Sequence, residues 1–253
     1  MMKEKYWRHE EEMIFFFIFL HWYLSLFCQT FFLHRYASHN MFVMSKFWER
    51  FFFFLTWLTQ GTSFLSPRAY AVMHRLHHKY SDTRKDPHSP IVVKDLIKMM
   101  LKTYEFYLDI VDRKKNFNDL EQDVPRWDSF ENFADNNLTR AFFVILYCLF
   151  YLLFAPSLWF LSLVPIHAMM GPIHGAIVNW CGHKYGYRNY KLNDNSKNTL
   201  PIDVVTFGEL LQNNHHRYPN HLCFSKRWYE IDFGYIVCLL FFKLQIIAPK
   251  KTF

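Results

Sequence analysis

The segment at residues 13–39, "MIFFFIFLHWYLSLFCQTFFLHRYASH", decides the fold because an uncharged apolar run leads directly into two histidines. Residues 13–33 contain no Asp, Glu, Lys or Arg. A helix of about 20 apolar residues is long enough to cross the hydrocarbon core of a bilayer. The pattern therefore predicts a transmembrane helix that ends where His34 and His39 begin a polar region.

A second uncharged stretch, residues 141–180, is interrupted near its middle by an Ala-Pro-Ser sequence. Its length and this break predict a helical hairpin with spans at about 138–155 and 158–180. Buried helices of a soluble protein are the alternative, but a run this long without a charge fits them poorly. We therefore expect an all-α integral membrane protein with about three transmembrane helices.

The remaining sequence, at 34–137 and 181–253, is polar and rich in histidine, and predicts a helical cap beside the membrane. Within the cap, residues 51–65 are apolar but too few for a full crossing, which indicates a re-entrant or interfacial segment. Residues 94–109 and 233–248 predict further surface-lying helices.

The distribution of charge predicts the orientation in the membrane. The net charge is +7, and six Lys or Arg residues follow the first span between Arg35 and Lys79. Because cytoplasmic loops carry an excess of Lys and Arg, we expect the cap and its active site on the cytosolic face and the N-terminus outside. The whole chain, 1–253, is expected to be one multi-pass membrane domain, in a bacterial inner membrane. No nucleic-acid-binding motif accompanies the positive charge, so an anionic membrane surface, substrate or partner is expected, and no nucleic acid.

Fourteen histidines are present, and most of them fall into four short clusters. On an α-helix, positions i, i+3 and i+4 lie within about 60° of one another, so each run of the H-x-x-H-H type offers one ligand face. His34 and His39 are five residues apart, about 140° around an α-helix, and would need a frayed helix end or two different metals. The clusters are "HRYASH" (His34, His39), "HRLHH" (His74, His77, His78), "NWCGH" (Asn179, His183) and "QNNHH" (Gln212, His215, His216).

The number of histidines favours two metal ions over one. Imidazole suits iron, zinc and copper alike, but eight histidines exceed the three or four ligands of a single zinc site. A redox-active pair beside hydrocarbon points to oxygen chemistry on an apolar substrate. For any one pair, a surface or capping histidine is the simpler alternative, but four clusters at one membrane face argue against it.

The four clusters, read as "HRYASH", "HRLHHKYSDTRKDPH", "NWCGHKYGYR" and "GELLQNNHHRYP", resemble the histidine boxes of the membrane acyl-CoA (stearoyl-CoA, delta-9 type) fatty acid desaturases. The resemblance covers order and spacing from about residue 13 to about residue 228. It implies a di-iron centre, with Asn179 contacting iron through water. Carried over motif by motif, the implied ligands are His34, His39, His74, His77, His78, His183, His215 and His216.

The resemblance also implies the reaction and its partners. The family removes two hydrogens from an unactivated acyl chain with O2 and leaves a cis double bond, with electrons from a ferredoxin or cytochrome b5 type of donor. No Gly-x-Gly-x-x-Gly fingerprint or haem domain is found, which fits an external donor. The double-bond position, the chain length and the carrier (CoA, membrane lipid or carrier protein) are left open. The sequence also leaves open two other functions. One is a lipid hydroxylase or carotenoid oxygenase of the membrane di-iron set, and the other is a non-enzymatic metal-binding membrane protein.

Two features depart from the family pattern. One span, in place of the usual two, precedes the first box, which would change the orientation of the N-terminus. Gln212 stands where acyl-CoA desaturases usually have histidine, although front-end desaturases similarly carry glutamine there. Because an amide oxygen is a harder and weaker ligand than a ring nitrogen, the sequence leaves open whether Gln212 binds iron or a water.

Several further residues have two interpretations each. Asp82, Asp86 and Glu209 are candidates to orient metal-bound histidines, or else form helix caps and turns. His21, His167 and His174 lie inside predicted spans, where hydrogen bonding within the bundle is expected. A third set could bind an anionic head group or only set the topology: Arg68, Arg75, Lys79 and Arg188.

Overall fold

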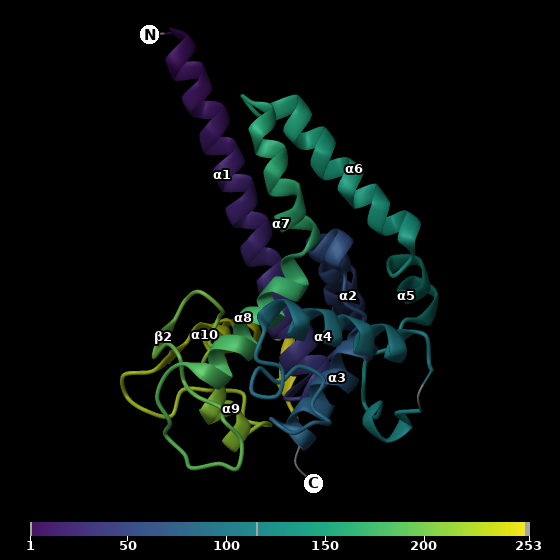
Figure 1. Cartoon of the computed structure of the whole chain (residues 1–253), viewed down its shortest axis with the longest axis vertical. Helices are drawn as coiled ribbons and strands as arrows, with labels where there is room; N and C mark the ends of the chain where they lie inside the picture. The colour runs from purple at the N-terminus through teal and green to yellow at the C-terminus, as the bar shows by residue number, and fades with distance from the viewer. Residues whose placement is uncertain (1, 115, 251–253) are drawn as a thin grey trace.

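The computed structural model describes residues 2–114 and 116–250 and is mostly helical (Figure 1). The side chains of residues 2–10 lie outside the description, including that of His9, which the sequence predicts at the surface. The elements are α1 (Met2–Cys28), η1 (Gln29–Ser38), β1 (Phe42–Met44), α2 (Lys46–Gln60), η2 (Gly61–Ser63), α3 (Pro67–Tyr80), α4 (Leu96–Val111), η3 (Asn118–Leu120), α5 (Asp128–Ala134), α6 (Asn137–Phe154), η4 (Leu158–Leu163), α7 (Val164–Ala168), α8 (Met170–Lys184), β2 (Ile202–Asp203), α9 (Gln212–Arg217), β3 (Ile231–Asp232), α10 (Phe233–Lys243) and β4 (Ile247–Pro249).

Among the residues that the structure describes, two continuous apolar helices are long enough to cross a membrane, Glu11–Ser38 and Asn137–Phe154. A bent pair, Leu158–Ala168 and Met170–Lys184, whose axes differ by 63°, is apolar enough to make a third crossing if the two helices form one broken span. In Figure 1, α1, α6 and α7 extend together toward one end of the molecule, and the cap elements gather at the other end. The prediction of an all-α membrane protein with about three transmembrane helices is confirmed.

The bend corrects the expectation of one continuous helix over 158–180. Pro172 lies four residues after Ala168, the last residue of α7. A proline ring clashes with the carbonyl four residues earlier and has no N–H to donate, so the helix ends and a new one begins. The backbone N–H of Gly171 instead donates to the Ser63 hydroxyl at 3.1 Å. The restart directs α8, which carries Asn179 and His183, into the cap.

The apolar segment at 51–65 does not carry the chain across the membrane. It forms the end of α2 and the short η2, and the chain then returns through α3. His39, before the segment, and His74, after it, lie 2.7 Å apart at their Nε2 atoms. Both flanks therefore meet at the same place, as a re-entrant or interfacial segment requires. The other two predicted surface helices are present as α4 and α10.

Aromatic packing fixes the end of the first span against the cap. Phe31 stacks on Phe42, with ring centroids 5.0 Å apart, and contacts Phe52 at 4.8 Å. These side chains are at most 2% exposed. Burial of a phenylalanine contributes roughly 1.5–3 kcal/mol, so several such contacts hold η1 firmly. The fully buried Arg35 binds Asp232 at 2.8 Å and ties the same helix to the far end of the chain.

Two histidines of the transmembrane bundle form a hydrogen-bonded chain, as predicted. His21 Nε2 donates to the Thr59 carbonyl at 2.7 Å, because a carbonyl only accepts. Neutral His21 then accepts at Nδ1 from His167 Nδ1 at 2.6 Å, and Tyr151 donates to His167 Nε2 at 2.6 Å. For His174 the prediction is wrong: within the described residues its nitrogens have no hydrogen-bond partner, and its ring packs edge-on against Trp22.

Candidate metal centre

A π-helix brings the first two histidines together. In η1 the backbone N–H of His39 donates to the carbonyl of His34 at 3.2 Å, an i→i+5 bond. This wider turn places residues five apart on the same side of the helix, and the two ring centroids are 4.9 Å apart. The expected separation of about 140° is wrong because it assumes α-helical geometry. Neither a frayed end nor separate sites are needed for His34 and His39.

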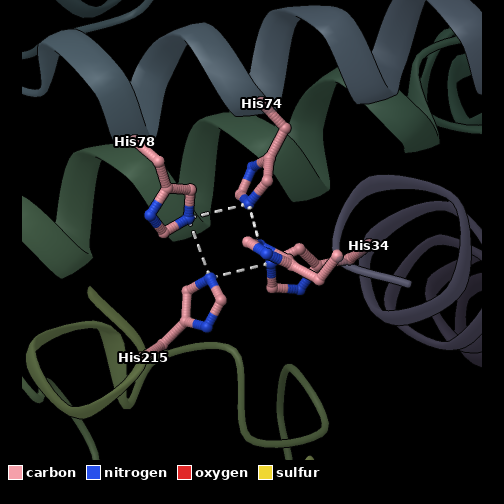
Figure 2. A group of neighbouring side chains, drawn as sticks. His34, His74, His78 and His215 are labelled. Atoms are coloured by element: carbon pink, nitrogen blue, oxygen red, sulfur yellow. Dashed lines mark hydrogen bonds between the residues drawn. The ribbon is translucent and has the colours of Figure 1, made fainter. Parts of the chain in front are cut away.

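Five histidines from three segments form one cluster, here called the five-histidine cluster. Each offers a ring nitrogen, and these nitrogens lie within 4.8 Å of one another. Figure 2 shows four of the rings turned toward each other between η1, α3 and α9. The members are His34, His39, His74, His78 and His215.

The contacts in the five-histidine cluster cannot all be hydrogen bonds. Four Nε2–Nε2 distances of 2.7–3.0 Å link the five rings in a chain, 34–215–78–74–39. An Nε2 atom carries either one hydrogen or one lone pair, so it takes part in only one hydrogen bond. Five such atoms therefore form at most two hydrogen bonds. One cation bound by all five nitrogens would satisfy their lone pairs.

A second group, the three-histidine cluster, comprises His77, His183 and His216. Each Nε2 atom in it is buried and has no hydrogen-bond partner in the described part of the chain. Each Nδ1 atom is held by a carboxylate: His77 by Asp86 at 3.0 Å, His183 by Asp82 at 3.0 Å and His216 by Asp194 at 2.9 Å. This is the arrangement of metal-binding histidines, whose other N–H is donated to a carboxylate that fixes the ring.

The electrostatics keep the histidine lone pairs available. Burial is the largest cause that lowers the pKa of His39, His74, His78 and His215 well below the usual value, so these rings are neutral at neutral pH. Burial opposes ionisation of Asp82, but the hydrogen bond and charge of His183 outweigh it and lower the pKa of Asp82 to about 2. The carboxylate is therefore ionised and accepts from the ring.

Neighbouring histidines in the chain belong to different clusters. On α3, His74 and His78 are one turn apart and join the five-histidine cluster, whereas His77 joins the other. On α9, His215 and His216 divide in the same way. The expectation of one ligand face for each run is therefore wrong, because adjacent residues point about 100° apart. The two clusters are adjacent, with the rings of His78 and His216 4.5 Å apart.

Gln212 and Asn179 lie on the helices that carry the three-histidine cluster. Gln212 is one turn before His216 on α9, and a side chain at Gly182, next to His183, would collide with it. Its amide nitrogen donates to the Glu209 carbonyl at 2.9 Å. Asn179 is one turn before His183, and its amide nitrogen donates to the Gly175 carbonyl at 2.8 Å. Both amide groups are thus oriented by backbone carbonyls.

The carboxylates proposed from sequence to orient histidines do so in the structure. Asp82 and Asp86 bind the rings described above, and Glu209 lies with Oε2 2.5 Å from His34 Nδ1. Glu209 also accepts from the Thr30 hydroxyl and is 5% exposed, so it is not a surface helix cap.

Four supporting residues were missed by sequence reasoning. Asp194 follows His183 in an irregular loop with no periodic pattern, so nothing in the sequence links it to His216. The two asparagines of "QNNHH" fasten α9. Asn213 accepts from the backbone of Asn189 and Tyr190. The fourth is Glu230, which accepts from Asn214 at 2.8 Å. The signal that was available is the asparagine pair directly before two histidines.

The four candidate cations have different roles. Arg68 binds Glu121 at 3.1 Å and the Ile110 carbonyl at 2.9 Å, and Arg75 donates to the carbonyls of Ser38 and Leu120. These two are structural. The other two, Lys79 and Arg188, are exposed.

Comparison with known proteins agrees with this centre. The sequence matches the family model described as "Fatty acid desaturase" over residues 13–235, which include both histidine clusters. The chain belongs to the fatty acid desaturase family. Family membership makes it an oxidoreductase that acts on fatty acyl chains, and the apolar helices make it a membrane protein.

Relatives of this chain include desaturases named for acyl chains on lipid and desaturases named for acyl-CoA. The sn-1 stearoyl-lipid 9-desaturase of Synechocystis sp. is 29% identical, with 87% of this chain and 67% of the relative aligned. Delta-9 acyl-lipid desaturase 2 of Arabidopsis thaliana is 27% identical, covering 87% and 68%. The acyl-CoA C20 Delta5-desaturase of Anemone leveillei is 29% identical, covering 90% and 70%.

Proposed function

We propose that the protein is an O2-dependent di-iron desaturase that introduces a cis double bond into a long acyl chain carried by CoA or a membrane lipid. One observation carries the proposal: eight buried or half-buried histidines from four segments form two adjacent clusters whose ring nitrogens converge without enough hydrogen-bond partners. Imidazole is a suitable ligand for iron, and two clusters suit two ions.

The residues that would hold the two ions follow from the clusters. The five-histidine cluster would hold one iron. The three-histidine cluster would hold the other, with Gln212 as a fourth ligand through its amide oxygen and Asn179 through a water. Bound iron supplies the oxidant that breaks unactivated C–H bonds, which side chains cannot do alone.

The protein's own residues orient and shield this site. Asp82, Asp86 and Asp194 accept the Nδ1 hydrogens of their histidines, so that the Nε2 lone pairs face inward. Glu209 lies 2.5 Å from His34 Nδ1. His77, His183 and His215 are about 1% exposed, which excludes bulk water from the reacting centre. The apolar span Glu11–Ser38 carries His34 near its end and so brings the membrane interior next to the cluster. We propose that the acyl chain approaches the site from the bilayer along this helix.

The setting of the reaction is part of the proposal. The cap is proposed to face the cytosol of a bacterium, with the chain acting as one membrane domain. Electrons are proposed to come from an external carrier of the ferredoxin or cytochrome b5 type. The named relatives include both acyl-lipid and acyl-CoA desaturases, which supports either carrier for this chain.

Expression in a host that lacks desaturases tests the function. We expect the wild-type chain to produce an unsaturated fatty acid, and His78→Ala to abolish it. His221→Ala is the matched control, because His221 is an exposed histidine. A hydroxylated or ketone product would instead support a hydroxylase or oxygenase. Product formation by His78→Ala at the wild-type level would refute the ligand assignment.

A further inference from the structure

In two segments next to the histidine clusters, the acidic side chains are buried or nearly so and most of the basic side chains are exposed. The segments 79–90 and 182–232, which carry His183, His215, His216 and the carboxylates that hold cluster histidines, contain seven acidic residues, and the side chains of these residues are all buried or nearly so. Three of them hold histidines of the three-histidine cluster, and Glu209 holds His34. The seven are Asp82, Asp86, Asp194, Asp203, Glu209, Glu230 and Asp232.

The basic residues of the same segments have the opposite distribution. Seven of them are exposed, and the other three, Lys184, Lys197 and Lys226, are half-buried. No acidic residue of these two segments is exposed, so the outer charge is entirely positive. The exposed residues are Lys79, Arg84, Lys85, Arg188, Lys191, Arg217 and Arg227, and together they are called the basic face.

Contacts between the loops show that the basic face is continuous. Arg227 Nε donates to Asn189 Oδ1 at 3.2 Å, beside Arg188. Arg217 lies 5.4 Å from the ring of Tyr218, and Tyr218 packs edge-on against Tyr190 with centroids 5.4 Å apart.

The loop of Arg84 and Lys85 joins the same surface. The Asn195 backbone N–H donates to Asp82 at 2.7 Å, which connects this loop to the one that carries Lys191. All the exposed cations are thus borne by loops and helix ends that contact one another.

The position of the basic face matches the entry point for electrons. Arg217 directly follows His216, and Arg84 is two residues from Asp82, which holds His183. In Figure 1, α9 lies at the end of the molecule opposite the N-terminus of α1 and the turn between α6 and α7. This end faces away from the membrane-crossing helices, so a soluble macromolecule has access to it.

The reaction requires electrons that the chain does not hold. Resting on the proposed function, each double bond consumes one O2, two electrons and two protons from outside, takes two hydrogens from the acyl chain and releases two waters. We propose that the basic face docks a small soluble electron-carrier protein through an acidic surface. Each docking oxidises the carrier by one electron and reduces the metal centre by one, so two dockings serve one double bond. Opposite fields on the two surfaces raise the rate of encounter, most strongly at low salt.

A charge-reversal variant tests the proposal by binding, without metal or turnover. The variant is Arg84→Glu, Lys191→Glu and Arg217→Glu, with one exposed residue from the loop after α3, one from the loop after α8 and one from the end of α9. The matched control reverses three exposed cations at and beside α4: Lys94→Glu, Lys98→Glu and Arg113→Glu. The probes are an acidic [2Fe–2S] ferredoxin and the soluble haem domain of cytochrome b5. With metal-free full-length protein in detergent at low salt, we expect the variant to weaken binding of at least one probe by about tenfold or more. The control should bind as the wild type does.

Reduction of the iron-loaded protein gives the second measurement. We expect the variant to be reduced by the protein probe at least about tenfold more slowly than the wild type, and by dithionite at the same rate. Wild-type protein that binds neither probe, or a variant and control that bind alike, would overturn the proposal. So would an unchanged reduction rate, or a KM for acyl-CoA that rises in dithionite-driven turnover, since the face would then bind the substrate head group. Dithionite-driven desaturation by the wild type tests the proposed function separately.

Discussion

The two histidine clusters lie side by side but are held in different ways. In the five-histidine cluster, five ring nitrogens converge within 4.8 Å, and one carboxylate, that of Glu209, supports one ring. In the three-histidine cluster there are fewer rings, but each has its own carboxylate. The first depends on the number of nitrogen ligands, and the second depends on the orientation of fewer ligands. The comparison predicts that the two metal positions respond differently to mutation.

Replacing each of two adjacent histidines by alanine should disrupt one cluster at a time, and we expect these variants to show the largest loss of activity. His77→Ala removes a nitrogen from the three-histidine cluster and His78→Ala removes one from the five-histidine cluster. We expect both to lower activity at least about 10³-fold, because the proposed di-iron reaction needs both ions. His77→Ala should reduce iron from about two to about one per chain, measured by mass spectrometry of the purified protein. Two irons in both variants would contradict the division into clusters.

Neutralising a supporting carboxylate should affect one cluster only. We expect Asp194→Asn to weaken metal binding at the three-histidine cluster by about 10–100-fold, because His216 loses its charged partner. The second metal equivalent should bind more weakly in a titration of metal-free protein, while the first is unchanged. Asp119→Asn, at an exposed acidic residue, is the control. An equal loss of affinity for the first and the second metal equivalent would show that the carboxylates do not distinguish the clusters.

Gln212 offers a way to make the clusters more alike. If its amide oxygen is the fourth ligand of the three-histidine cluster, Gln212→His should tighten the weaker metal equivalent by about tenfold, because imidazole is the better ligand for iron. Gly182→Ala should weaken the same equivalent, since the added methyl group would displace the Gln212 side chain. Titration of both variants with ferrous iron measures these shifts. Wild-type affinity in both would mean that Gln212 does not contact metal.

Acid should also destabilise the metal-free protein, as the contribution of one buried histidine illustrates. Burial lowers the pKa of His216 to about 4, so the unfolded chain takes up a proton near pH 6.5 while the folded chain stays neutral. Stability is therefore full above pH 6.5 and falls as the pH decreases toward 4, by about 3 kcal/mol from this residue.

His77 opposes this loss of stability in acid, because the charge of Asp86 outweighs burial and raises the pKa of His77. Melting of chelator-treated protein at pH 7 and pH 5 checks the sign. A melting temperature at pH 5 that equals or exceeds that at pH 7 would contradict the assigned burial.

The apolar runs were sufficient to predict the membrane helices, because hydrocarbon requires long uncharged segments whatever the tertiary packing. The bend at Met169 was missed because Pro172 had to be weighed against the apolar run around it. The pairing of His34 with His39 required a π-helix, which a sequence pattern based on α-helical periodicity excludes.

The candidate ligands were predictable because chemistry limits which residues bind metal, but their division into two clusters was not. That division depends on how α3, α8 and α9 cross, which comes from contacts between distant segments. Asp194 was unpredictable for the same reason, since a loop carries it to His216.

The most direct test of the two-cluster centre is an anomalous diffraction experiment at the iron absorption edge on anaerobically loaded protein crystals. Two peaks are expected, one among the Nε2 atoms of the five-histidine cluster and one among those of His77, His183 and His216. A single peak, or two peaks that both lie in one cluster, would contradict it.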